Sequence, residues 1–185
     1  NIPRYFLDMH HPDTIGYFGI MAMPITLIVL FVSFILQPKV LELSHLRAEN
    51  NKTQFDVEIK KIFALTIATG TAILGGTFLV GIPVLNFIFG VDFSDFHIEL
   101  IVMVVGGVIN AMVSVFMNIL VIMRRIRSQL IILTITSVAL GFCVSGIILQ
   151  SGFMGAAISF AVTCSVQTGL LAVVYKRSIG RLNYG

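Results

Sequence analysis

Charged side chains are scarce in this chain. Only 11% of its 185 residues are Asp, Glu, Lys or Arg, whereas 57% are apolar and the mean hydropathy is +0.98. Soluble domains carry about 25% charged and roughly 45–50% apolar residues. The contrast excludes an ordinary soluble domain, a disordered tail and a nucleic-acid-binding module, and it predicts a polytopic membrane protein.

Motifs for catalysis, metals and cofactors are also lacking. The only two cysteines, Cys143 and Cys164, lie inside apolar runs, so they indicate small buried apolar side chains rather than a disulfide. The sequence has no Gly-rich phosphate loop, no nucleophile elbow and no Cys/His metal framework. We therefore expect no catalytic residue, no metal and no cofactor, and the chain is not expected to be an enzyme.

Long uncharged stretches are what the sequence does contain. They are residues 14–38, 62–91, 100–123 and 128–175. A bilayer core of about 30 Å needs roughly 20 helical residues, so the first three stretches hold one span each and the fourth holds two. The fourth is interrupted by one polar turn signal, Gln150-Ser151-Gly152. The expected helices are therefore about 14–37, 62–89, 100–123, 128–150 and 153–175, in one all-α membrane domain covering residues 1–185.

Basic residues are concentrated on one side of this five-helix arrangement. If the helices alternate in direction, residues 38–61, 124–127 and 176–185 share a side and carry 11 of the 12 Lys and Arg residues. Only Arg4 lies on the other side. Because cytoplasmic loops are enriched in Lys and Arg, residue 1 is expected outside the cell and residue 185 in the cytoplasm.

The segment 38–61 is amphipathic. Residues 40–43 are mostly apolar and continue the first helix, while Phe55, Ile59, Ile62 and Phe63 recur at helical spacing. The pattern predicts a cytoplasmic helix that runs along the inner membrane surface before the second span begins.

Two prolines lie inside expected spans. Pro24 is in the first helix, and Pro83, preceded by Gly81, is in the second. Proline removes an amide donor and clashes with the preceding turn, so kinks or local unwinding are expected near both. Pro24, Gly81 and Pro83 are hinge candidates. The alternative is that these are ordinary prolines of membrane helices.

Polar residues within the spans recur every four positions. The five spans contain no Asp, Glu, Lys, Arg or His, which argues against a self-contained proton or sodium pathway. Two stripes remain, Gly106-Asn110-Ser114-Asn118 and Gly155-Ser159-Thr163-Gln167. Such stripes allow close helix packing or line a water-accessible cavity. If the stripes line a cavity, the substrate-path candidates are Asn110, Ser114, Asn118 and Gln167, with Arg4 at the outer mouth of that cavity.

The outer loop holds Asp92, Asp95, His97 and Glu99. These side chains are potential metal ligands or an acid/base pair, and they keep open a membrane-embedded polysaccharide polymerase or acyltransferase. Their spacing matches no motif with a mechanism, however. We expect a solvated loop, and a purely structural membrane subunit is a further alternative.

Six short segments carry a resemblance to a known family. They are residues 1–8 (NIPRYFLD), 15–20 (IGYFGI), 23–24 (MP), 81–85 (GIPVL), 89–92 (FGVD) and 152–158 (GFMGAAI). On these residues the chain resembles polysaccharide-unit flippases, which belong to the superfamily that includes multidrug exporters of the MATE type. An exporter of that superfamily is the alternative within transporters.

The resemblance implies two six-helix lobes around a central cavity. The five helices would form most of the second lobe, and an N-terminal lobe and one helix of the same chain would be missing from this sequence. Such flippases move lipid-linked oligosaccharide from the cytoplasmic to the outer leaflet by alternating access. The implied setting is a bacterial cytoplasmic (inner) membrane, with membrane lipids and the lipid-linked oligosaccharide as partners. Cationic residues meet the pyrophosphate in related flippases, and Arg4 is the one candidate here.

Overall fold

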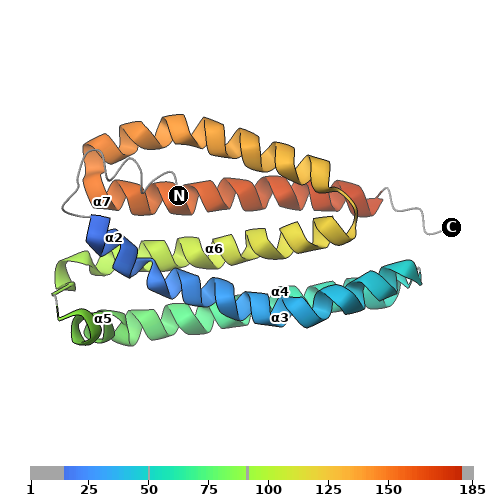
Figure 1. The fold of residues 1–185 in the computed structure, drawn as a ribbon, viewed down its shortest axis with the longest axis horizontal. Helices are drawn as coiled ribbons and strands as arrows, with labels where there is room; N and C mark the ends of the chain where they lie inside the picture. The colour runs from blue at the N-terminus through green and yellow to red at the C-terminus, as the bar shows by residue number, and fades with distance from the viewer. Residues whose placement is uncertain (1–14, 50, 91, 181–185) are drawn as a thin grey trace.

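The computed structural model describes residues 15–49, 51–90 and 92–180, and nearly all of them are helical (Figure 1). No strand occurs in these ranges, so the all-α prediction is confirmed. In chain order the elements are α2 (Ile15–Met21), α3 (Met23–Ala48), α4 (Lys52–Gly76), the π-helix η2 (Thr77–Gly81), α5 (Ile82–Phe89), the 3-10 helix η3 (Ser94–Phe96), α6 (His97–Ile122) and α7 (Ile126–Gly180).

Four helical stretches in the described ranges are long and apolar enough to cross a membrane. They are Gly19–Ala48, Lys52–Phe89, Ser94–Ile122 and Phe153–Ile179. They correspond to four of the five expected spans and make this a multi-pass membrane protein. The fifth expected span, 128–150, is represented by a shorter apolar stretch, Ile126–Ala139. The structure describes the backbone of residues 140–152 but not their side chains.

Helix α7 turns back on itself, although its backbone is helical throughout (Figure 1). The Nε2 atom of Gln167 donates a hydrogen bond to Oγ1 of Thr136 at 3.2 Å. In a straight helix, residues 31 positions apart would be separated by about 46 Å. The two arms of α7 run antiparallel, so the bend lies midway in the sequence between two residues that face each other. The contact between Thr136 and Gln167 therefore centres the bend at about residues 151–152. That position lies within the predicted turn, Gln150-Ser151-Gly152.

Helix α6 lies between α7 on one side and the pair α3 and α4 on the other (Figure 1). Two adjacent glycines permit these close contacts. A Cβ atom on Gly106 would lie 2.7 Å from Cδ1 of Phe160 and 3.2 Å from Cα of Ala161, both in α7. A Cβ atom on Gly107 would lie 3.0 Å from the side chain of Ile25 in α3. The Gly106-Gly107 pair therefore brings α6 close to both neighbours, as small residues do in membrane bundles.

Both proline sites interrupt their helices, as the sequence predicts. The first expected helix, 14–37, is divided at Ala22 into α2 and α3, and Pro24 occupies the first turn of α3. In the second, the π-helical turn η2 precedes Pro83, which lies in the first turn of α5. Pro83 has no N–H to offer the carbonyl of Leu79, and a widened turn accommodates that loss.

The segment 38–61 differs from the expected surface helix. Helix α3 continues through Pro38 to Ala48, and α4 begins at Lys52, so the two helices extend past the end of α6 as a hairpin (Figure 1). Leu43, Phe55 and Ile59 are at most 2% exposed. The apolar side of the segment is buried within the bundle instead of against lipid.

Charged groups link the two arms of this hairpin. The Nζ atom of Lys39 lies 2.7 Å from Oε2 of Glu42 and 2.9 Å from Oε2 of Glu58, and Nζ of Lys61 lies 2.6 Å from Oε1 of Glu58. At the turn, the side chain of Asn51 accepts a hydrogen bond from the amide of Gln54 and caps the N-terminus of α4. The hairpin is thus held by apolar burial and by the Lys39–Glu58 ion pair between its arms.

Candidate functional site

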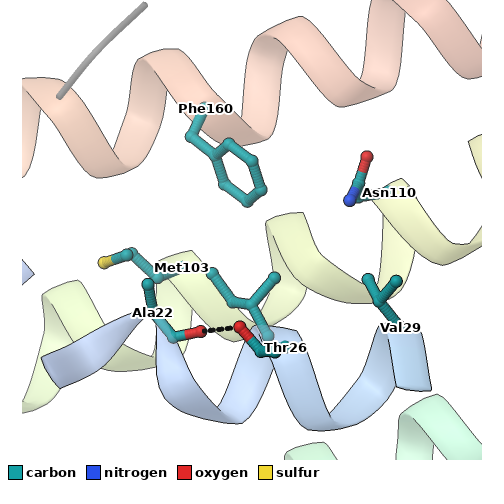
Figure 2. Close-up of a pocket in the computed structure, with 7 residues that line it drawn as sticks. Ala22, Thr26, Val29, Met103, Asn110 and Phe160 are labelled. Atoms are coloured by element: carbon teal, nitrogen blue, oxygen red, sulfur yellow. Dashed lines mark hydrogen bonds between the residues drawn. The ribbon is translucent and has the colours of Figure 1, made fainter. Parts of the chain in front are cut away.

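Two residues of the α6 stripe, Asn110 and Asn118, line cavities that are walled on the other side by α3, and we call this α3–α6 contact the seam. The first cavity has a volume of about 260 Å³ and is lined by Ala22, Ile25, Thr26, Val29, Met103, Asn110 and Phe160 (Figure 2). The second has a volume of about 330 Å³ and is lined by Ser33, Leu36, Gln37, Val40 and Asn118. Two of the predicted path residues, Asn110 and Asn118, therefore each line a cavity, two turns apart on one helix.

Helix α3 contributes the opposite wall of both cavities. Its lining residues 25, 26, 29, 33, 36, 37 and 40 are separated by one, three or four positions, so they form one face of the helix. Three of them, Thr26, Ser33 and Gln37, are polar. The sequence analysis did not identify this stripe, because only Ser33 and Gln37 follow the spacing of four and Thr26 lies seven positions before Ser33.

The polar groups of the seam are bonded mainly within their own helices. The hydroxyl of Ser114 donates to the carbonyl of Asn110 at 3.3 Å, and Nδ2 of Asn118 donates to the carbonyl of Ser114 at 2.8 Å. On α3, Thr26 and Ser33 donate to carbonyls four residues earlier. These bonds satisfy the three hydroxyl donors and one N–H of Asn118 in an apolar environment, while the hydroxyl and amide oxygens retain capacity to accept. The seam is suited to a ligand rich in hydroxyl groups.

The α7 stripe does not join this seam. Gln167 is bonded to Thr136 in the other arm of α7 and lines neither cavity. Ser159 is 2% exposed, and its hydroxyl has no hydrogen-bond partner among the described residues. Helix α7 meets α6 through Thr168, whose hydroxyl lies 3.3 Å from the carbonyl of Ile109. The structure thus brings Asn110, Ser114 and Asn118 to one helix face and leaves Gln167 between the two arms.

Two of the three hinge candidates meet at a third cavity. Pro24 of α3 and Gly81 of η2 both line an apolar space of about 380 Å³ between α3 and the η2–α5 segment. Pro83 is not among its lining residues. Arg4 lies outside the described residues.

The loop between α5 and α6 is organised as a turn. Oδ1 of Asp92 accepts hydrogen bonds from the Ser94 hydroxyl at 2.5 Å, the Ser94 amide at 2.9 Å and Nδ2 of Asn86 at 3.3 Å. The hydroxyl of Ser94, followed by its amide, holds the pKa of Asp92 below its usual value. Among the described residues, no group of three or more His, Cys, Asp and Glu side chains could hold a metal ion.

An aromatic cluster joins three elements beside this loop. The ring of Tyr17 in α2 lies 5.5 Å from the rings of both Phe93 and Phe96, and the ring of Phe96 lies 5.3 Å from that of Phe153 in α7. Aromatic pairs at these distances are stabilising beyond the area that they bury. The cluster ties α2, η3 and α7 together at one end of the bundle.

The two ends of the bundle differ in charge. The α3–α4 turn, the α6–α7 connection and the end of α7 lie toward one end, and the described Lys and Arg residues all belong to that half (Figure 1). The loop between α5 and α6 lies at the other end and carries Asp92, Asp95 and Glu99.

No protein-family model, curated protein or solved structure matches the chain.

Proposed function

We propose that this chain forms part of a transporter that moves lipid-linked sugar repeat units from the cytoplasmic to the outer leaflet, for assembly of a cell-surface polysaccharide. The observation that carries the proposal is the polar seam between α3 and α6, with its two cavities, inside an otherwise apolar multi-pass bundle. A sugar headgroup cannot cross hydrocarbon unaided, because each unsatisfied polar group costs several kcal/mol. The seam offers such a headgroup hydrogen-bonding partners while the lipid chain stays in the bilayer.

In this proposal the bundle acts by alternating access, as five helices of the second lobe of a MATE-like flippase in a bacterial inner membrane. The helix interruptions at Ala22 and at η2 support it, because prolines and π-helical turns are the points at which helices bend, and alternating access requires helices to rock. The resemblance to polysaccharide-unit flippases favours lipid-linked oligosaccharide over the drugs moved by exporters of the same superfamily.

The proposal requires the basic end of the bundle to be cytoplasmic. We expect a cysteine at Ser94 to react with a membrane-impermeant thiol reagent on intact cells, and a cysteine at Thr53 to react only after permeabilisation. Both positions are exposed, and Cys143 and Cys164 are replaced with Ala to remove the background. The reason is the retention of Lys- and Arg-rich segments on the cytoplasmic side. The reverse labelling pattern would refute the orientation.

The role of the seam is tested by Asn110→Leu and Asn118→Leu in the full-length protein. Losing one hydrogen bond of about 1 kcal/mol to the sugar predicts about a fivefold fall in transport for each variant. The measurement is surface polysaccharide in a strain that depends on this protein, divided by the amount of the protein in the membrane.

The matched control is Ser165→Leu. Ser165 is exposed on α7, its hydroxyl is bonded to the carbonyl of Ala161, and it lines neither cavity. We expect this variant to keep both transport and abundance. If both Asn variants transport normally at normal abundance, the seam is not a substrate path. If abundance falls in step with transport, the stripe serves packing alone.

A further inference from the structure

The half of the basic end that α6 and α7 form carries basic residues and no acidic residues. From Leu100 to Gly185 the sequence contains no Asp or Glu. The described basic residues of this stretch are all exposed, and they form what we call the α6–α7 cationic surface: Arg124, Arg125, Arg127, Lys176 and Arg177. None of the five forms an ion pair with a carboxylate in the described ranges.

The other half of the same end is largely neutralised. Lys39 and Lys61 are paired with Glu58, and Lys39 also with Glu42. The guanidinium of Arg47 donates to the carbonyl of Ile122 at the C-terminal end of α6. Across residues 38–61 as a whole, five Lys and Arg residues are offset by four Asp and Glu residues, whereas the five basic residues of the α6–α7 half are offset by none.

The backbone adds to the positive potential of this surface. Arg124 adopts a left-handed backbone conformation with φ of 56°, a region that favours glycine. The amide of Arg124 donates a hydrogen bond to the carbonyl of Val121, and the amide of Arg125 donates to the carbonyl of Leu120, so that α6 ends here. Helix α7 then begins at Ile126 with no acid in its first turn. Arg124, Arg125 and Arg127 therefore lie between the negative C-terminal end of the α6 dipole and the positive N-terminal end of the α7 dipole, and an anion is favoured at the α7 end.

The position of these basic residues relative to the membrane boundary indicates which anion they bind. Arg124 follows directly on the uncharged stretch 100–123, and Lys176 follows directly on the uncharged stretch 128–175. Arg127 and Lys176 are equally far in sequence from the centre of the bend in α7, so they lie level with each other on its two arms. Cations within a turn of an apolar span reach the lipid headgroup region, and anionic headgroups attract them there.

We propose that the α6–α7 cationic surface binds the headgroups of anionic phospholipids in the leaflet at that end. All five basic residues lie within two positions of an uncharged stretch, at the depth of the headgroups, whereas an acidic protein would require cations that project beyond them. The inference is independent of the proposed transport activity, since it concerns the ends of α6 and α7 at the basic end of the bundle rather than the α3–α6 seam.

The experiment uses the absence of tryptophan from the chain. Leu130, one turn after Arg127, is 57% exposed, and Leu65, one turn after Lys61 in α4, is 47% exposed. Leu130→Trp and Leu65→Trp place a single fluorophore beside each half of the basic end. Each variant is reconstituted in vesicles that mix phosphatidylcholine with phosphatidylglycerol, with bromine on the chains of one lipid or the other, and quenching reports which lipid lies at the reporter.

We expect phosphatidylglycerol to be favoured by about threefold or more at Leu130→Trp and by less than twofold at Leu65→Trp, because only the first site faces uncompensated cations. Adding Arg125→Gln and Arg127→Gln should bring the preference at Leu130→Trp to about one, and so should high salt. Lys52→Gln with Lys60→Gln removes two charges from α4 and should leave it unchanged. Equal quenching by both lipids at Leu130→Trp would overturn the proposal, and so would an equal preference at both reporters.

Discussion

Substitution of Gly106 with leucine is expected to prevent folding of the bundle. A Cβ atom at this position would lie 2.7 Å from the ring of Phe160 and 3.2 Å from the backbone Cα of Ala161. The ring can rotate away, but the backbone of α7 moves only if the whole helix separates from α6. Overpacking by one methyl group costs about 1–3 kcal/mol, and the larger side chain exceeds that range.

The measurement is the free energy of unfolding of Gly106→Ala in detergent, together with the membrane abundance of Gly106→Leu. Gly75→Ala is the control, because a Cβ atom at Gly75 would meet nothing within 4 Å. A second variant, Gly106→Ala with Phe160→Ala, removes the ring contact alone. We expect partial recovery from it, since the contact with Ala161 persists. Full stability of Gly106→Leu would show that α6 and α7 do not approach closely.

A short bifunctional thiol reagent is expected to crosslink Thr136→Cys to Gln167→Cys almost completely. The side chains of Thr136 and Gln167 are 3.2 Å apart across the two arms of α7, whereas a straight helix would separate them by about 46 Å. The experiment is run with Cys143 and Cys164 replaced by Ala, and the measurement is the reagent-dependent shift in gel mobility after cleavage of the chain between the two positions.

The control pair is Ile126→Cys with Gln167→Cys. Ile126 belongs to the same arm as Thr136 but lies ten residues away, about 15 Å along the helix axis. This pair should remain uncrosslinked by the short reagent. Crosslinking of both pairs would indicate an irregular arm, and crosslinking of neither would contradict the folded-back α7.

Much of the fold follows from local properties of the sequence. Hydropathy and length identified four of the membrane-spanning helices, because a span must be apolar over about 20 residues whatever it packs against. The turn at Gln150-Ser151-Gly152 and the interruptions near Pro24 and Pro83 were predictable for a similar reason. Each depends on the hydrogen-bonding capacity of its own residues.

The candidate site was predictable only in part. The spacing of four along α6 identified Asn110 and Asn118, which line the two cavities. The same spacing suggested Gln167, which the structure bonds to Thr136 instead. The two stripes look alike in sequence because packing and cavity lining both call for small polar residues at helical intervals.

The sequence by itself determined that this is a multi-pass helical membrane protein with a basic and an acidic end. Only the tertiary structure decided that α3 supplies Thr26, Ser33 and Gln37 to the seam, and that residues 38–61 form a hairpin instead of a surface helix. The physical reason is the solvent. In water, apolar periodicity marks the buried face of a helix, but in a bilayer both lipid and protein are apolar. Phe87, 91% exposed, and Ile28, fully buried, are equally apolar in sequence, so the rotation of each helix is set by packing alone.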